Sequence, residues 1–180
     1  MAHAVVILAA GLGTRMKSRL PKVLHPLLGK PLVGYCIDTA FASGAEKVVV
    51  VIGHGAEQVR QTFAGYPNLS FVVQEQQLGT AHALAQAQPV LADFQGPIVV
   101  TQGDTPLTRV ETLTGLVDTM QKEQAGMALL TMRLEDPTGY GRILRDEQGQ
   151  ILGNVEQKDA TPAELAIREI NPGVYCFDGS

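Results

Sequence analysis

The sequence Ala4-Val5-Val6-Ile7-Leu8-Ala9-Ala10 passes directly into Gly11-Leu12-Gly13-Thr14-Arg15-Met16. The apolar run is typical of a strand buried on both faces, as in a parallel sheet. The glycines of the following segment permit positive φ and let a ligand approach the backbone closely. Backbone N–H groups in such turns bind anions. The cations that follow are Arg15, Lys17, Arg19 and Lys22. This pattern predicts a phosphate-binding loop behind a central strand. The other interpretation is a tight connection with solvated charges.

Two better-known phosphate-binding loops are excluded by one residue. A Walker A loop requires glycine directly before Lys-Ser or Lys-Thr, and this chain has Met16 before Lys17-Ser18. The dinucleotide fingerprint G-x-G-x-x-G fails at the same methionine. A Gly-x-Gly pair after a strand is a weak signal by itself, so the function has to be inferred from the wider sequence.

The composition is that of a globular protein. The chain has 180 residues, 45% of them hydrophobic, and a net charge of −4, which suits one domain with a sizeable core. The absence of a long basic run argues against nucleic acid or an anionic membrane as partner. No signal-peptide pattern and no apolar run near the roughly 20 residues of a membrane span occur, so a cytoplasmic location is expected. Cys36 and Cys176 lie in apolar stretches and are expected to be small buried hydrophobes.

Strand and helix patterns alternate along most of the chain. Strands are expected at 48–52, 69–73, 98–101 and 127–132, and helices at 31–44, 56–63, 79–88 and 110–120. This order predicts an α/β fold of Rossmann-like, three-layer type, with a mostly parallel sheet covered by helices on both faces. After residue 136, short strand patterns at 141–144, 151–155 and 170–177 predict a small β-rich subdomain.

Two polar segments follow expected strands, where ligands of α/β sheets bind. Gln74 offers a donor and an acceptor that suit the edge of a base such as uracil, and Thr80 can cap the next helix. On spacing alone, a polar turn with a helix cap is the favoured interpretation. Asp104 offers a carboxylate suited to Mg²⁺, or it caps the turn before Pro106.

Together these motifs resemble the sugar-phosphate nucleotidyltransferase superfamily. The resemblance rests on Leu-Ala-Ala-Gly-x-Gly-Thr-Arg-Met from Leu8, on Leu-Pro-Lys-Val-Leu-His from Leu20, and on further matches as far as Asn171. Within the superfamily, the chain is most similar to the N-terminal uridylyltransferase region of a bacterial bifunctional family of N-acetylglucosamine-1-phosphate uridylyltransferases and glucosamine-1-phosphate acetyltransferases. The resemblance implies Mg²⁺-dependent transfer of UMP from UTP to N-acetylglucosamine 1-phosphate. UDP-N-acetylglucosamine, a cell-envelope precursor, and pyrophosphate would be the products.

The resemblance also implies roles for residues of the nucleotide half of the site. Arg15 and Lys22 would be the catalytic cations that neutralise the triphosphate. Asp104 matches the aspartate of Gly-Asp-x-Pro-Leu, which binds the catalytic magnesium in the family. Gln102 is a weaker contact, because the family commonly has an aromatic residue there. The remaining implied nucleotide contacts are Leu8, Ala9, Ala10, Gly11, Gly13, Gln74, Gly79, Thr80 and Gly103.

Three later residues match sugar contacts of the family. Gly141 lies in a Tyr-Gly-Arg turn expected to lie against the sugar, and Glu156 matches an acceptor for sugar hydroxyls. Asn171 matches the asparagine of Ile-Asn-Thr-Gly, although Pro172 stands here in place of the threonine and removes a backbone donor.

Other functions stay open at this point. A relative could use dTTP with glucose 1-phosphate, or CTP with a molybdenum cofactor, and a non-catalytic nucleotide-sugar-binding module is the alternative from another class. The joint presence of Arg15, Lys22 and Asp104 favours catalysis, because binding alone needs no metal ligand beside the phosphates.

The family pattern extends beyond this sequence. In the family, a second metal-binding asparagine, the end of the nucleotidyltransferase domain and a left-handed β-helix follow downstream. The β-helix carries CoA-dependent acetyltransfer and forms a homotrimer. Residues 1–180 are therefore expected to be a C-terminally incomplete nucleotidyltransferase (pyrophosphorylase) domain without the acetyltransferase domain, and this chain alone is expected to be poorly active.

Overall fold

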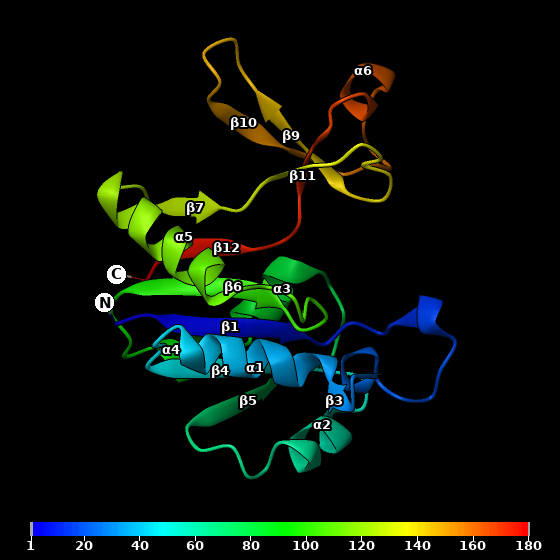
Figure 1. Cartoon of the computed structure of the whole chain (residues 1–180), viewed down its shortest axis with the longest axis vertical. Helices are drawn as coiled ribbons and strands as arrows, with labels where there is room; N and C mark the ends of the chain where they lie inside the picture. The colour runs from blue at the N-terminus through cyan, green and yellow to red at the C-terminus, as the bar shows by residue number, and fades with distance from the viewer. Residues whose placement is uncertain (1, 180) are drawn as a thin grey trace. The chain divides into compact units, whose positions relative to one another are not determined.

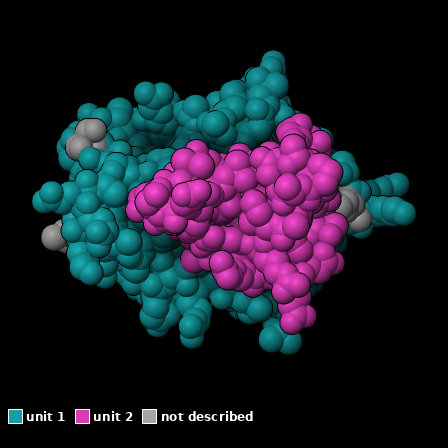
Figure 2. Space-filling view, turned by 90° about the horizontal axis from the view of Figure 1, so that it is seen from above, with its two compact units in different colours: residues 1–128, 175–180 teal, residues 129–174 magenta. Residues whose placement is uncertain are grey.

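The computed structural model of the chain describes residues 2–179, and the chain divides into two compact units. Unit 1 contains the residues up to 128 and those from 175 onward, whereas unit 2 contains residues 129–174. Figure 1 shows the elements of both, and Figure 2 shows the units in different colours. Unit 2 is thus a single continuous segment inserted into unit 1.

Unit 1 is built on a six-stranded sheet with the order β5-β4-β1-β6-β12-β7. The central strand β1 pairs in parallel with β4 and β6, β4 pairs in parallel with β5, and β12 is antiparallel to β6. The expected mostly parallel sheet is therefore confirmed. Its strands are β1 (Ala4–Ala9), β4 (Lys47–Ile52), β5 (Leu69–Val73), β6 (Pro97–Gln102), β7 (Met127–Leu129) and β12 (Tyr175–Asp178).

Helices cover both faces of this sheet, as predicted. In Figure 1, α1 and α5 lie in front of the sheet, and α3 and α4 lie behind it. On the α3–α4 side, alternate residues of β1 such as Val6 and Leu8 share a core with Ala83, Leu91 and Phe94. The helices of unit 1 are α1 (Leu32–Ala42), α2 (Ala56–Thr62), α3 (Thr80–Ala85), α4 (Gln88–Leu91) and α5 (Val110–Lys122), with 3₁₀ turns η1 (Thr14–Met16) and η2 (Lys22–Leu24).

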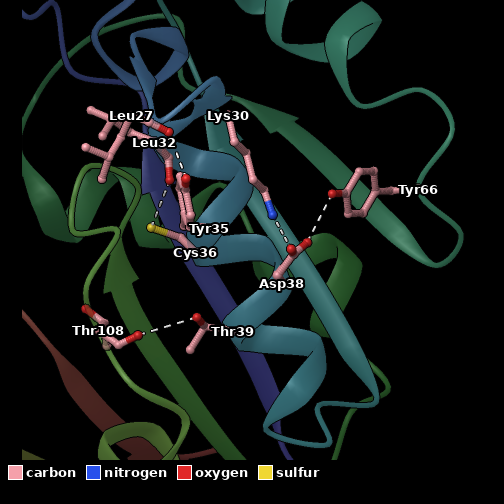
Figure 3. A network of polar contacts seen from close by, with 9 residues as sticks. All are labelled: Leu27, Lys30, Leu32, Tyr35, Cys36, Asp38, Thr39, Tyr66 and Thr108. Atoms are coloured by element: carbon pink, nitrogen blue, oxygen red, sulfur yellow. Dashed lines mark hydrogen bonds and ion pairs between the residues drawn. The ribbon is translucent and has the colours of Figure 1, made fainter.

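The first helix fixes the segment that follows η2. A short hairpin of β2 (Pro26–Leu27) and β3 (Lys30–Pro31) leads into α1. Lys30 forms an ion pair with Asp38 of α1, and the Tyr66 hydroxyl donates to the same carboxylate at 3.0 Å (Figure 3). The Tyr35 hydroxyl donates to the carbonyl of Leu27 at 2.7 Å. These contacts hold the chain directly behind Lys22 against the helix.

Unit 2 is a four-stranded sheet with the order β10-β9-β11-β8, paired antiparallel throughout. This arrangement agrees with the β-rich subdomain expected after residue 136. A short helix, α6 (Pro162–Leu165), begins with a capping box in which Thr161 and Glu164 bond each other's backbone N–H. The strands are β8 (Met132–Arg133), β9 (Gly141–Arg145), β10 (Ile151–Val155) and β11 (Glu169–Asn171).

Three expected elements are split in the structure. The strand expected at 127–132 forms β7 and β8, which belong to different sheets, and the strand expected at 170–177 forms β11 and β12. Both breaks occur where the chain passes between the units, and Gly173 at the second break has a φ of 80°. The helix expected at 79–88 divides into α3 and α4. Local periodicity does not indicate which sheet a strand joins.

One ion pair in unit 2 makes its stability depend on pH. Hydrogen bonds from Arg145 lower the pKa of the Glu169 carboxyl to about 2. Because the pKa is depressed in the folded state, the ionised carboxylate stabilises the fold above the unfolded pKa near 4.5, and this contribution is lost as the pH falls toward 2.

We therefore expect a loss of about 1–2 kcal/mol between pH 5 and pH 2 that depends on Glu169, after allowance for solvent screening. Urea unfolding followed by circular dichroism measures it. The variant Glu169→Gln should show a smaller loss over this range, by about that amount. The same loss in both proteins would contradict the assignment.

Candidate nucleotide-binding site

The candidate site of unit 1 lies where three parallel strands end. The glycine loop follows β1, Gln74 follows β5, and Gly103 follows β6. The Gly103 N–H donates to the carbonyl of Leu8, and the Gln74 N–H donates to the carbonyl of Ile52, both at 2.8 Å. Since parallel strands end at the same edge of a sheet, these bonds bring the predicted nucleotide contacts together.

The glycine loop packs tightly against Lys22. Gly13 has φ 61° and ψ 30°, and its carbonyl accepts a hydrogen bond from Met16 N–H that closes η1. A Cβ atom added at Gly13 would lie 2.7 Å from Cβ of Lys22. Glycine is therefore required here by both backbone conformation and space. The side chain of Arg15, the other predicted catalytic cation, lies outside the described part of the structure.

Lys22 connects this loop to the end of β6. Its ammonium group forms an ion pair with the Asp104 carboxylate, and the two side chains are 39% and 28% exposed. The turn itself is closed by Thr105, whose hydroxyl donates to the carbonyl of Gln102 at 2.9 Å. A capping role for Asp104 in this turn is therefore disfavoured. The arrangement places a lysine and an aspartate side by side next to exposed loop backbone.

Helix α1 contacts the turn after β6 through Cys36. The Cys36 thiol donates to the carbonyls of Gln102, at 3.4 Å, and of Leu32, at 3.6 Å (the second is drawn in Figure 3). Burial raises the pKa of this thiol to about 11, and the charge of Asp104 acts in the same direction. Cys36 is thus a protonated, buried donor, and Cys176 is also buried and free, as expected for both cysteines.

A pocket of about 240 Å³ opens beside the glycine loop, and the predicted base contacts Gln74, Gly79 and Thr80 are among its lining residues. Gln74 in this pocket is only 3% exposed. Its side-chain nitrogen donates to the carbonyl of Gly79 at 3.2 Å and is hydrogen-bonded to Nδ1 of His82 at 2.9 Å. The lining residues are Leu8, Ala10, Gly11, Gln74, Gln77, Gly79, Thr80, Ala83 and Gln102.

These bonds change what Gln74 offers to a ligand. Its nitrogen is held by the protein, whereas Oε1 has no hydrogen bond to the residues that the structure describes. The expectation that Thr80 caps the helix is wrong: Gly79 occupies the cap position without a side-chain bond, and Thr80 is the first helical residue. Gly79 has φ 104°, a conformation that L-residues rarely adopt. Sequence reasoning missed Gln77, which the polar run around it could have indicated.

A second pocket, of about 370 Å³, shares Gly11 with the first. Its other lining residues are Gly13, Thr14, Met16 and Lys22. One pocket is therefore lined by amide side chains and the other by loop backbone and a lysine. This pair of adjoining pockets suits a nucleotide whose base and phosphates need different surroundings.

The predicted sugar contacts lie in unit 2, where two of them adjoin Asn154, a residue that the sequence did not single out. Gly141 of β9 pairs directly with Asn171 of β11. A Cβ atom added at Gly141 would lie 2.4 Å from Oδ1 of Asn154, whose Nδ2 donates to Oε1 of Glu156 at 3.2 Å. Gly141 thus lies between Asn171 on one neighbouring strand and Asn154 on the other, and Asn154 is hydrogen-bonded to Glu156. The position of Asn154 two residues before Glu156, near the end of an expected strand, is the signal that could have indicated it.

Arg142 fixes the turn that carries Gly141. Its side chain is buried, and it donates to the carbonyl of Tyr140 and, at 3.5 Å, to Oε1 of Gln157. The same Gln157 oxygen accepts a hydrogen bond from Gly139 N–H. Arg142 therefore joins the turn at 139–141 to the segment that holds Glu156.

We expect Arg142→Ala to lower the free energy of unfolding by about 2–4 kcal/mol, because the Tyr140 carbonyl and the Gln157 side chain lose a charged donor and the buried side chain leaves a cavity. Urea unfolding monitored by circular dichroism measures the change. The matched control, Lys158→Ala, removes an exposed cation of the same unit and should change stability by less than about 0.5 kcal/mol. Equal effects of the two substitutions would contradict this role.

The strand order, the parallel strand ends and the two adjoining pockets define an α/β nucleotidyltransferase fold. The chain belongs to the MobA-like NTP transferase domain family, which it matches over residues 5–164. It is accordingly a nucleotidyltransferase, and the resemblance inferred from the motifs is confirmed.

Curated relatives carry the name "Bifunctional protein GlmU". The protein of Thermus thermophilus is 60% identical over 177 residues, which are 98% of this chain and 38% of the relative. That of Pelobacter propionicus is 51% identical over 97% of this chain and 38% of the relative. That of Burkholderia mallei is 57% identical over 94% of this chain and 37% of the relative. The chain thus spans less than two fifths of the length of these relatives.

Two solved structures share the fold. A UDP-glucose pyrophosphorylase in complex with UDP-glucose superposes with a TM-score of 0.79 at 22% identity, covering 99% of this chain and 76% of the other. An apo UDP-glucose pyrophosphorylase gives a TM-score of 0.76 at 19% identity, covering 99% and 77%. At these identities the likeness concerns the fold alone.

Within residues 2–179, no group of three or more histidine, cysteine, aspartate or glutamate side chains is placed to hold a metal ion. Over the same residues, no helix combines the length and apolar character needed to cross a membrane.

Proposed function

We propose that the chain transfers UMP from UTP to N-acetylglucosamine 1-phosphate, giving UDP-N-acetylglucosamine and pyrophosphate. The observation that carries this proposal is the Lys22–Asp104 pair beside the glycine loop, where a cation and a carboxylate adjoin the candidate phosphate pocket. The names of the relatives support the choice of this reaction among those of the family.

The transfer requires no covalent intermediate with a residue of the protein. A phosphate oxygen of the sugar phosphate attacks the α-phosphorus of UTP, and the bond from this phosphorus to the bridging oxygen breaks. Pyrophosphate leaves with the electron pair, and no proton has to be moved. Positioning and neutralisation of charge supply the catalysis in such reactions. The loop backbone from Leu8 to Gly13 would hold the phosphates, and Arg15 and Lys22 would neutralise their charge.

Asp104 would hold Mg²⁺, which fits a single carboxylate at a strand end that is open to phosphate oxygens. When bound, the ion supplies charge neutralisation on those oxygens. Lys22, which lines the adjoining pocket, would add a second positive charge next to the phosphates. The proximity of the two side chains supports this division of work, because both would face the same triphosphate.

Two groups of residues would select the substrates. Gln74 would accept a hydrogen bond from the N–H of uracil through Oε1, with Gly79 and Thr80 beside the base. In unit 2, Glu156, Asn171 and the Gly141 backbone would bind the sugar hydroxyls, with Asn154 beside Gly141 and Glu156.

We expect Gln74→Ala to lower kcat/KM for UTP about 10- to 100-fold, because the pocket loses one hydrogen bond to the base and the support for Gly79. The KM for N-acetylglucosamine 1-phosphate should stay within about twofold. Steady-state kinetics with each substrate varied in turn measures both. Gln61→Ala, which alters an exposed glutamine of α2, is the control. An equal loss with every nucleoside triphosphate offered would contradict recognition of the uracil edge.

The experiment that tests the proposed function is pyrophosphate release from UTP with N-acetylglucosamine 1-phosphate and Mg²⁺. Parallel assays contain dTTP or CTP, and glucose 1-phosphate as acceptor. Preferred turnover of UTP with N-acetylglucosamine 1-phosphate is the expected result. Preference for another pair would assign the chain to a different reaction of the family. Tight binding of UTP without turnover, in this chain and in a longer natural form, would identify a nucleotide-binding module instead.

A further inference from the structure

Unit 2 contains a pocket that the proposed function does not use. It has a volume of about 440 Å³ and is built entirely from residues of this unit. Three of its six lining side chains are arginines, and one is acidic. Ile143, which is buried, and Ile167 provide an apolar lining. The lining residues are Arg133, Ile143, Arg145, Ile167, Arg168 and Glu169.

The sheet register explains why these side chains meet. Glu169 of β11 lies directly opposite Arg133 of β8, and Ile170 lies opposite Arg142 of β9. Because side chains alternate along strands, Glu169 shares a face with Ile143 and Arg145. Three neighbouring strands therefore present the pocket on one face of the sheet, and Arg168 adds a cation from the residue that precedes β11.

The charges in this pocket are not balanced. Arg145 donates two hydrogen bonds to Glu169, at 2.9 and 2.7 Å, and a third to the carbonyl of Gly149 at 2.7 Å. This pair satisfies both of its members. The charge of Arg133 also acts on Glu169, but the guanidinium groups of Arg133 and Arg168 have no hydrogen bond or salt bridge to any residue from 2 to 179. Two positive charges with free donors therefore line a concave surface.

We propose that this pocket binds a small phosphate ester, with Arg133 and Arg168 holding the phosphate and the isoleucines contacting its carbon skeleton. Guanidinium groups match the geometry of phosphate oxygens and bind them through paired hydrogen bonds. The volume lies within the roughly 300–1,000 Å³ typical of small-molecule pockets. The pocket shares a sheet face with Gly141 and Asn171, so its occupant would bind next to the candidate sugar contacts without belonging to them.

The test is a titration of the ¹⁵N-labelled full chain, followed by NMR at constant ionic strength. The probes are phenyl phosphate, inorganic phosphate and, as the ionic control, sodium chloride. We expect saturable shifts of the amides at 143–145 and 167–169, with a Kd on the order of 1 mM. Phenyl phosphate should bind more tightly than inorganic phosphate because its ring covers the isoleucines. Chloride should give no saturable shift.

Matched variants distinguish binding in this pocket from a nonspecific effect of the positive charge of the protein. Arg133→Gln with Arg168→Gln should weaken binding at least about tenfold, the loss expected when a charged hydrogen bond is removed. Lys122→Gln with Lys158→Gln removes the same charge from two exposed positions outside the pocket and should change the Kd less than about twofold. Arg168→Gln alone should give an intermediate Kd. Thermal melts confirm that each variant is folded.

Three results would overturn the proposal. The first is the absence of saturable shifts at these amides with either phosphate probe. The second is an equal loss of binding in the lysine control variant. The third is a response confined to the loop at 11–14, which would mean that phosphate binds only at the nucleotide site of unit 1. None of these readouts uses turnover, so the result is independent of the reaction proposed above.

Discussion

Replacing Asp104 by asparagine is expected to reduce turnover by about 10²–10⁴-fold and to leave the fold intact. The amide keeps the shape of the side chain but loses the negative charge that a divalent cation needs. The Lys22–Asp104 pair is partly exposed, so its loss should change the free energy of unfolding by less than about 1 kcal/mol. A defect in turnover without a defect in stability separates a role in the site from a role in the fold.

The measurement is kcat as a function of Mg²⁺ concentration, with unfolding curves for both proteins. The variant should require a much higher Mg²⁺ concentration to reach its residual rate. Asp118→Asn is the matched control, because Asp118 is an exposed aspartate of α5. Unchanged turnover and unchanged Mg²⁺ dependence in Asp104→Asn would exclude Asp104 as the metal ligand.

The second large effect is expected from Gly13→Ala. The added methyl group would lie 2.7 Å from Cβ of Lys22, and the backbone at this position has a left-handed φ of 61°. The residue can be accommodated only if the loop or Lys22 moves. We expect kcat/KM to fall by more than about 100-fold, since small displacements of charged groups are costly in transfer reactions.

The control for this substitution is Gly29→Ala in the hairpin before α1. Gly29 also has a left-handed φ, of 84°, but a Cβ atom there meets nothing within 4 Å. It therefore carries a similar backbone strain, of about 1 kcal/mol, away from the site. Kinetic constants and unfolding curves for both variants give the comparison. If both lost activity equally, the defect would come from strain and not from displacement of Lys22.

The sequence predicts the parts of unit 1 that depend on local pattern. The run from Ala4 to Ala10 identifies the central strand because a strand buried on both faces must be apolar throughout. The convergence of the glycine loop, Gln74 and Asp104 follows from the geometry of parallel strand ends. These inferences need no knowledge of distant contacts.

Other parts of the site depend on contacts that no local pattern contains. Gln74 is a polar residue in the sequence, but its hydrogen bond to His82 decides which of its atoms is left for a ligand. Asn154 becomes part of a candidate site only because β10 is placed beside β9. The charge imbalance of the arginine pocket likewise requires the register of β8, β9 and β11.

The chain enters and leaves unit 2 at neighbouring points, since the Leu130 N–H donates to the carbonyl of Val174 at 3.0 Å. Unit 1, by contrast, is assembled from both ends of the chain, with β12 added beside β6. Under the proposed function, the residues that recognise the acceptor sugar all lie in one continuous segment, residues 129–174, whose two ends are hydrogen-bonded to each other. Substitutions within residues 129–174 would therefore change the preference for the acceptor sugar without altering the nucleotide contacts of unit 1.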